Sequence, residues 1–103
     1  MKTISSQRYI DDETVETKRA AADYEVFVSP SFEIDGETYR VVLDGHHSLE
    51  AAKLDGVEPT YIEQDATDND RIGLLNAGNV EDFLAATHMG DDYYDIATGH
   101  DVW

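Results

Sequence analysis

The chain has 103 residues, of which 41% are hydrophobic, and its formal net charge is −16. A chain of this length is expected to form one compact domain that buries roughly 65% of the surface exposed by the unfolded chain. The absence of cysteine excludes disulfides, thiolate metal sites and thiol nucleophiles.

The charge balance, 23 acidic residues against 7 Lys and Arg, argues against direct binding to nucleic acids or anionic lipids. Such binding depends on cations that displace counterions from phosphates. The expected partner is instead a basic protein surface. Halophilic proteins also carry acidic surfaces, so solubility in a salty or crowded compartment is an alternative cause of the charge.

The hydropathy pattern contains no candidate membrane segment. No apolar run approaches the roughly 20 residues needed to cross a bilayer. The N-terminal residues also lack the apolar stretch of a secretory signal. We therefore expect a soluble, cytoplasmic protein with no membrane partner.

Residues 1–23 form a polar and charged N-terminal segment. Asp11 or Asp12 can cap a short helix, which is predicted over residues 13–22 with Val15 as its main apolar residue. No strand is predicted in this segment.

Residues 24–63 are predicted to form a core of strand, hairpin, helix and strand. A β-rich run covers residues 24–28, and a second short strand covers residues 32–34. Asp35-Gly36 is a strong hairpin signal between two such runs. The return strand, residues 38–43, ends in a continuous apolar run, which is typical of a strand in the buried middle of a sheet.

A short helix is predicted over residues 48–54, with Leu49, Ala52 and Leu54 facing inward. Gly56 follows its last turn, where a left-handed residue is favoured. Residues 60–63 form the next candidate strand, expected to return beside the previous one through a right-handed crossover. These elements predict a mixed sheet.

Residues 64–103 form the helical and aromatic C-terminal part. Short helices are predicted over residues 71–76 and 80–87, the second capped by Asn79 and with its apolar residues along one face. The tail is expected to form a small hairpin around Thr98-Gly99. The predicted fold class is α+β: a small mixed β-sheet with short helices packed on it, in a single domain spanning residues 1–103.

The segment from Val41 to Ala52 carries the clearest functional signal, because an apolar run breaks at Gly45 and passes directly into a helix. The free N–H groups of a helix N-terminus attract anions, and a preceding glycine lets a phosphate approach the backbone. This pattern conflicts with the strongly acidic composition.

The block from Phe32 to Ala52 resembles the core of the ParB and sulfiredoxin superfamily. In ParB-type domains the matching loop reads Gly-Glu-Arg-Arg and grips nucleotide or phosphate, while in sulfiredoxins it reads Gly-Cys-His-Arg and supplies the catalytic thiol. Gly45 matches the shared glycine, His46 and His47 take the next two positions, and Ser48 stands where both families have arginine.

The replacement of that arginine by Ser48 removes a charged fork that binds phosphate bidentately, so phosphate affinity is expected to fall. His46 cannot replace the sulfur nucleophile, which excludes sulfiredoxin activity. Two imidazoles and the backbone cradle remain.

Two hypotheses concern these histidines. In the catalytic one, His47 is a general base oriented by Asp44, Gly45 and Ser48 hold a phosphate, and His46 completes a metal-assisted phosphoesterase or nucleotide hydrolase. In the structural one, which we favour, one histidine packs beneath the loop and donates to a backbone carbonyl while the other lies in water.

A metal site at this histidine pair would require Asp44, His88 or His100 to converge on it, and nothing in the spacing demands that. The acidic segment 65–70 lacks the glycine and the closing glutamate of an EF-hand, so it is expected to be a solvated loop. No metal and no cofactor are expected.

Aromatic residues of the tail are interleaved with acids. Tyr93 and Tyr94 are candidate hydrophobic anchors of a protein interface, with packing in the core as the alternative. Trp103 is expected to lie in the core.

The favoured functional hypothesis is a non-catalytic inhibitor that imitates the charge of a nucleic acid. Such an inhibitor would occupy the basic groove of a DNA- or RNA-binding defence protein, such as a CRISPR effector or restriction enzyme. Short acidic phage proteins act in this way. The alternative is a retained ParB-type nucleotide-binding or phosphoesterase activity of the loop at Gly45. The candidate partner-binding carboxylates are Asp11, Asp12, Glu13, Glu16, Asp65, Asp68, Asp70, Asp91, Asp92 and Asp95.

Overall fold

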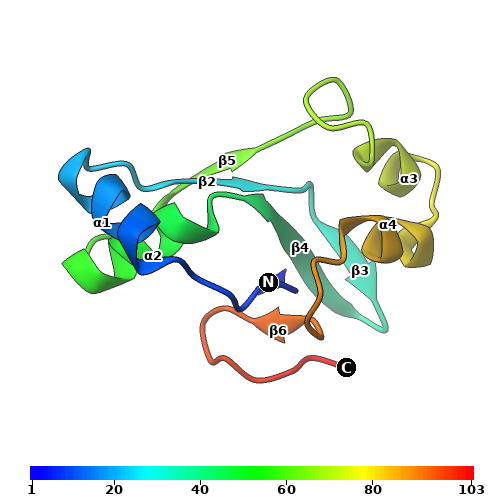
Figure 1. Ribbon diagram of the computed structural model, residues 1–103. Coiled ribbons are helices and arrows are strands. Elements are labelled where there is room, and N and C mark those ends of the chain that lie inside the picture. Colours follow the sequence, from blue (N-terminus) through cyan, green and yellow to red (C-terminus); the bar gives the residue numbers. More distant parts are fainter.

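The computed structural model describes all 103 residues and contains one six-stranded mixed sheet and four helices (Figure 1). This architecture confirms the α+β class. In chain order the elements are β1 (Lys2–Ser5), α1 (Asp12–Ala20), β2 (Glu25–Val28), β3 (Phe32–Ile34), β4 (Glu37–Asp44), α2 (His46–Asp55), β5 (Thr60–Glu63), α3 (Ile72–Asn76), α4 (Val80–Thr87) and β6 (Tyr94–Asp95).

The sheet is organised around β4, its longest strand. The strand order is β5-β2-β4-β1-β6, and β3 also pairs with β4. Strands β1 and β4 run parallel, as do β2 and β5, while β4 is antiparallel to β2 and β3. Asp35 and Gly36 both have positive φ angles in the turn between β3 and β4, so the predicted hairpin is confirmed.

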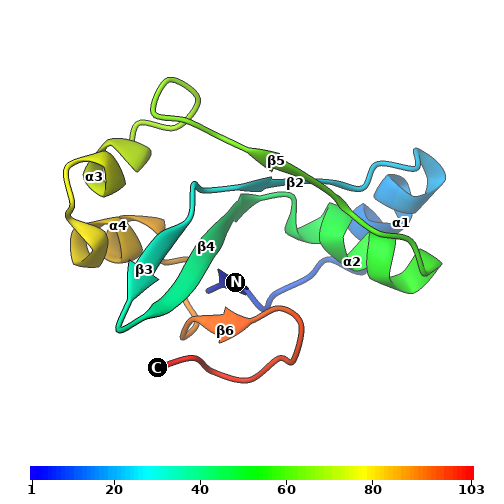
Figure 2. The same ribbon diagram turned by 180° about the vertical axis from the view of Figure 1, so that it is seen from behind.

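Both faces of β4 are buried, which explains its continuous apolar run. Tyr39, Val41 and Leu43 lie on one face and pack with Phe83 of α4 and with other residues of the larger hydrophobic cluster. Val42 belongs to a smaller cluster on the other face, where α2 lies. Figures 1 and 2 show α3 and α4 at one end of the sheet and α1 and α2 at the other.

Strand β1 was missed by the sequence analysis. Its only aliphatic residue is Ile4, so the segment has no run of apolar residues to indicate a strand. The strand nevertheless pairs with β4 on one side and β6 on the other, and both Ile4 and Ser5 are fully buried. Its place in the sheet therefore depends on partners more than 30 residues away in the chain.

The expected crossover from β4 to β5 is wrong. Strand β5 pairs with β2 instead, and β2 separates it from β4. Strands β2 and β3 pair with one side of β4, and β1 pairs with the other, so no edge of β4 remains for β5. The prediction that the sheet is mixed is confirmed.

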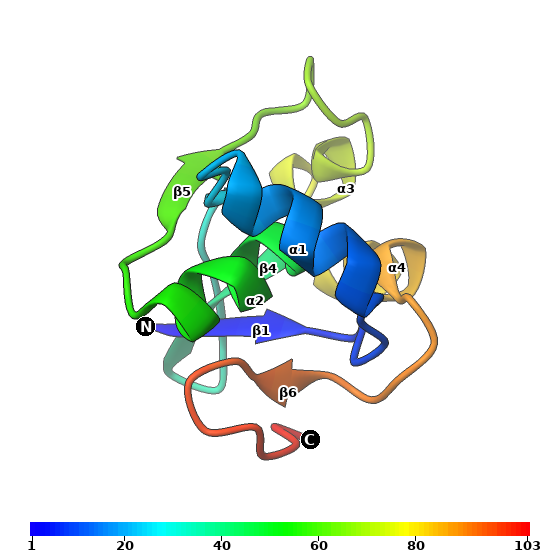
Figure 3. The same cartoon turned by 60° about the vertical axis from the view of Figure 1, so that its left-hand side comes forward.

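Helix α2 begins two residues earlier than predicted and ends at Asp55. Gly56 follows with a φ of 68°, as expected for a left-handed residue after a helix. Ala52 is fully buried, but Leu54 is 55% exposed, so its predicted inward position is wrong. Helix α1, residues 12–20, packs on α2 (Figure 3).

The C-terminal part follows the prediction in most respects. Helix α4 has the predicted bounds, with Phe83 and Thr87 buried. Tyr94 and Asp101 form an antiparallel bridge around the turn at Gly99. Trp103 is 54% exposed, contrary to the prediction that it lies in the core; its ring packs against the core residues Tyr39 and Tyr93 and leaves more than half of the side chain in solvent.

The helices of this structure are short, and the longest, α2, has ten residues. None has the length and apolar character of a membrane-spanning helix.

Candidate functional site

Gly45 joins β4 to α2 in a left-handed conformation with a φ of 90°. A Cβ atom at this position would lie 2.5 Å from the Glu25 carbonyl oxygen, which is closer than real Cβ contacts allow. The glycine is thus required where the loop passes β2. This packing role accounts for the residue without a bound anion.

Carboxylates surround the N-terminus of α2, although none of them accepts the N–H of His46, His47 or Ser48. Asp44 Oδ1 accepts the Gly45 N–H at 2.7 Å, and Ser48 Oγ donates to Asp23 Oδ1 at 3.4 Å. A cleft of about 250 Å³ at this end is lined by Asp23, Glu25 and Asp44 but by only one cation, Lys18. An incoming phosphate would therefore meet three negative charges.

Asp23 stays charged in this cleft. The Lys18 ammonium, which donates to Asp23 Oδ2 at 3.0 Å, and the Glu25 N–H lower the pKa of the Asp23 carboxyl. The one cation of the cleft is therefore already paired, and it does not provide a free binding group for phosphate.

His47 is held by the N-terminus of α1. Its Nε2 accepts the Asp11 N–H at 3.2 Å, while Asp44 bonds to Gly45 and not to His47. The predicted pair of general base and orienting carboxylate is not assembled, because α1 packs on α2 and engages the imidazole.

His46 lies beneath the loop, 6% exposed, with Nε2 2.6 Å from the Ser5 hydroxyl of β1. Its partner is thus a side chain and not the expected backbone carbonyl. Burial lowers the pKa of His46, and the nearby Asp44 carboxylate offsets part of this effect. The imidazole is therefore neutral near pH 7.

The other two histidines lie elsewhere. The His88 ring packs edge-on against Tyr93, and the His100 N–H donates to the Thr98 hydroxyl. No group of three or more His, Asp or Glu side chains is arranged to hold a metal ion.

A pocket of about 620 Å³ lies on the side of α2 away from this cleft. Helix α2 forms one wall and the C-terminal hairpin, residues 94–101, contributes another. It is lined by Gln7, Arg8, Ile10, His46, Leu49, Glu50, Lys53, Val57, Pro59, Tyr61, Tyr94, Ile96, Ala97, Thr98 and Gly99. Of the predicted site residues, His46 and Tyr94 line this pocket.

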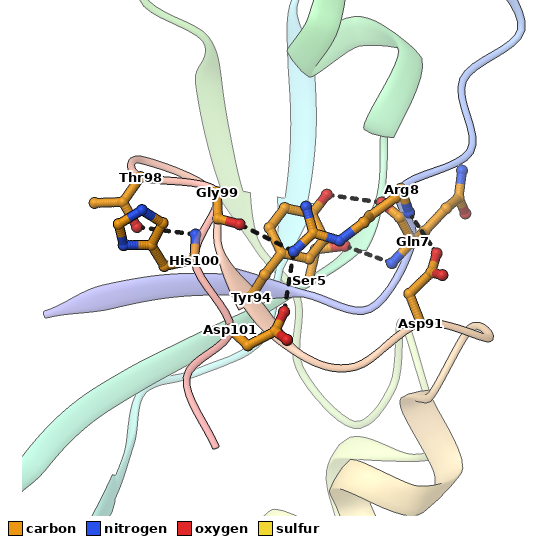
Figure 4. A network of polar contacts seen from close by, with 9 residues as sticks. All are labelled: Ser5, Gln7, Arg8, Asp91, Tyr94, Thr98, Gly99, His100 and Asp101. Carbon is orange, nitrogen blue, oxygen red and sulfur yellow. Dashed lines mark hydrogen bonds and ion pairs between the residues drawn. The ribbon is translucent and has the colours of Figure 1, made fainter.

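Arg8 fixes the hairpin that borders the pocket (Figure 4). Its guanidinium donates to the Gly99 carbonyl and to Asp101 Oδ1, both at 3.0 Å, and stacks on Tyr94 with 4.0 Å to the ring centroid. The Arg8 N–H donates to Asp91 Oδ2, and Tyr94 Oη donates to the Gln7 carbonyl. These contacts join the segment after β1 to the C-terminal tail.

The candidate carboxylates divide into two groups. Seven are exposed: Asp12, Glu13, Glu16, Asp65, Asp68, Asp70 and Asp92. Asp11, Asp91 and Asp95 are half-buried and hold loops, by accepting bonds from the Thr14 hydroxyl, the Arg8 N–H and the Ala97 N–H, respectively. Asp65 is exposed and also binds its own loop, where the Thr67 hydroxyl is the main cause of its lowered pKa.

The two tyrosines proposed as interface anchors are both engaged within the fold. Tyr93 is 8% exposed, and its hydroxyl lies 2.7 Å from both Thr87 Oγ1 and the Leu84 carbonyl oxygen. It is a core residue. Tyr94 is half-buried under the Arg8 guanidinium.

Sequence reasoning missed Ser5, Arg8 and Lys53. Ser5 lies in an unpredicted strand, so no local pattern indicated that it would meet His46. Arg8 and Lys53 had one usable signal, since each is among only seven cations in a chain of net charge −16.

Comparisons of the chain with known protein families, with curated proteins and with solved structures found no match in any of the three. The resemblance to the ParB and sulfiredoxin superfamily stays a prediction from the block Phe32–Ala52.

Proposed function

We propose that the protein is a non-catalytic binding protein that presents its carboxylates to the basic groove of a nucleic-acid-binding protein. The observation that carries this proposal is the exposure and the small number of ion pairs of the 23 carboxylates. None of them is buried, and only five form ion pairs, namely Glu16, Asp23, Glu37, Asp55 and Asp101. Most of the others are exposed and remain available to cations of a partner.

The exposed carboxylates occur at both ends of the molecule. Asp12, Glu13 and Glu16 lie on α1, while the loop 65–70 and the first turn of α4 carry others at the opposite end (Figure 1). The molecule is 40 Å long. At 3.4 Å per base pair, this length corresponds to about 12 base pairs of duplex DNA. The length thus matches a short stretch of duplex DNA, and the net charge of −16 compares with about 24 negative charges on its phosphates.

The contacts of the predicted loop support a binding role over a catalytic one. Asp23, Glu25 and Asp44 line the cleft at the helix N-terminus and would repel a phosphate there. His46 and His47 bond to different elements, β1 and the start of α1. No base, nucleophile and phosphate-binding group share one accessible site.

Partners of this class include CRISPR effectors and restriction enzymes, and we place the interaction in the cytoplasm. Both present Lys- and Arg-rich grooves that normally hold phosphates. A protein that fills such a groove would inhibit the enzyme without any reaction of its own.

Competition tests the proposal. Purified protein is titrated into a CRISPR effector and a restriction enzyme bound to fluorescent 12-base-pair DNA. We expect displacement of the DNA that weakens steeply with salt. A variant with Asp68→Asn, Asp70→Asn, Glu81→Gln and Asp82→Asn should displace DNA less well than the intact chain.

Two results would contradict the proposal. One is the absence of any complex with basic nucleic-acid-binding proteins at low salt. The other is hydrolysis of nucleotides or DNA with magnesium or manganese that is lost in both His46→Ala and His47→Ala.

A further inference from the structure

The pocket between α2 and the C-terminal hairpin differs in charge from the rest of the protein. Its lining includes two cations, Arg8 and Lys53, and one carboxylate, Glu50. The whole chain, in contrast, has more than three carboxylates for each cation. The volume of about 620 Å³ lies within the range of small-molecule sites.

Lys53 is the cation that the fold leaves free. The other six each have an ion pair, a hydrogen bond or an aromatic ring as partner, whereas Lys53 has none of these. Its position in the last turn of α2 is favourable for the helix dipole, but this does not require a place beside a pocket. An unpaired ammonium at the rim is available to a ligand.

His46 supplies a hydrogen-bond donor to the same pocket. Ser5 Oγ accepts the Gln7 N–H and lies 2.6 Å from His46 Nε2, and the buried Ser5 hydroxyl hydrogen has no other acceptor. We therefore assign Ser5 as the donor to Nε2, with the proton of the neutral imidazole on Nδ1. Nδ1 makes no hydrogen bond within the protein and is not among the fully buried atoms, so it keeps some contact with solvent, and His46 lines the pocket.

Seven of the 15 residues that line the pocket are hydrophobic. Leu49 of α2 and Ile96 of the hairpin pack against the small hydrophobic cluster, and Val57 adds an exposed apolar side chain at the rim. Tyr61 also lines the pocket, and the Arg40 guanidinium carbon lies 4.3 Å from the centroid of the Tyr61 ring. The pocket thus combines apolar side chains with one unpaired cation, Lys53.

We propose that this pocket binds a small organic carboxylate with an apolar or aromatic body. Lys53 would pair with the carboxylate, His46 Nδ1–H would donate to it, and Leu49, Tyr61 and Ile96 would contact the body. A single unpaired cation matches a monoanion better than a phosphate ester, which carries more charge into a field of −16. This site is independent of the proposed interaction with a basic protein.

The test uses the intact protein labelled with ¹⁵N and phenylacetate as the probe, with phenylacetamide as its uncharged counterpart. We expect saturable shifts at the amides of residues 46–53 and 94–99, with a dissociation constant of about 1 mM, as suits a ligand of ten heavy atoms. Phenylacetamide should bind about fivefold more weakly, or not measurably. The His46 ring should show a protonated Nδ1 in its ¹⁵N spectrum.

Two matched variants test whether the Lys53 ammonium is the group that pairs with the carboxylate of the ligand. Lys53→Gln should weaken phenylacetate binding about fivefold, because the exposed ammonium has no structural partner to lose. Lys2→Gln removes the same charge from a residue outside the pocket and should leave the affinity unchanged. Absence of saturable binding up to 20 mM (about 20 times the expected constant), equal affinity for the amide, or an equal effect of both variants would overturn the proposal.

Discussion

Ser5 and His46 form the buried link between β1 and α2, with Oγ and Nε2 2.6 Å apart although the two residues are 41 positions apart in the chain. Ser5→Ala leaves His46 Nε2 without a partner, which costs about 1–3 kcal/mol of unfolding free energy because a buried polar atom loses its hydrogen bond. Urea denaturation measures this loss. Ser31→Ala, at an exposed position, is the control, and equal stability of the two variants would contradict the role of the link.

The same histidine predicts a pH dependence. Burial lowers the pKa of His46 below its ordinary value of 6.5, so the unfolded chain binds a proton that the folded chain does not. The contribution of His46 to stability is therefore present above pH 6.5 and is lost as the pH falls towards the lowered pKa. Other groups also titrate, so the measurement is the difference between the intact chain and His46→Gln.

The comparison from pH 7.5 to pH 5 isolates this contribution. The stability of the intact chain relative to His46→Gln should decrease on acidification. A constant difference would show that the imidazole has the same pKa in both states. An increase would mean that the charged form is favoured in the fold.

Gly45 offers a prediction with an internal control. Gly36→Ala introduces a Cβ into open space at a φ of 83° and should cost about 1–2 kcal/mol from the left-handed conformation alone. Gly45→Ala has a similar φ and also places a Cβ 2.5 Å from the Glu25 carbonyl oxygen. We expect a distinctly larger loss of unfolding free energy for Gly45→Ala, and equal losses would refute the packing role.

The features that could be predicted from the sequence are those that depend on residues close together in the chain. The hairpin at Asp35-Gly36 and the left-handed Gly56 were correct, because turn and cap preferences depend on neighbouring residues. Strand β1 and the pairing of β5 with β2 depend on strands far away in the chain. No local pattern encodes those pairings.

The candidate site shows the same limit. The Gly45 loop was recognised as the junction of a strand and a helix, and this junction is correct. The contacts of Asp23 with the Ser48 hydroxyl and of His47 with the Asp11 N–H join segments that only the fold brings together. The pocket bordered by Arg8 and Lys53 was missed for the same reason.

The C-terminal tail should loosen when Arg8 is replaced. In Arg8→Gln the stacking on Tyr94 and the ion pair with Asp101 are lost, although both are partly exposed and contribute little to global stability. We expect faster amide hydrogen exchange at Asp95, Gly99 and Val102, whose N–H groups bond within or beside the hairpin. Lys2→Gln, which removes an ion pair at 4.0 Å, should leave these rates unchanged.

Added salt distinguishes charge repulsion from ion pairing as the main electrostatic effect in this fold. Only five of the 23 carboxylates have a cationic partner within 4.0 Å, so repulsion among the others should dominate. Raising ionic strength from 0.01 to 0.15 M shortens the Debye length from about 30 Å to about 8 Å, which screens repulsion across the 40 Å molecule. The melting temperature should therefore rise with sodium chloride over this range. A fall would show that the five ion pairs outweigh the net charge, and the carboxylates would then be less available to a basic partner than we propose.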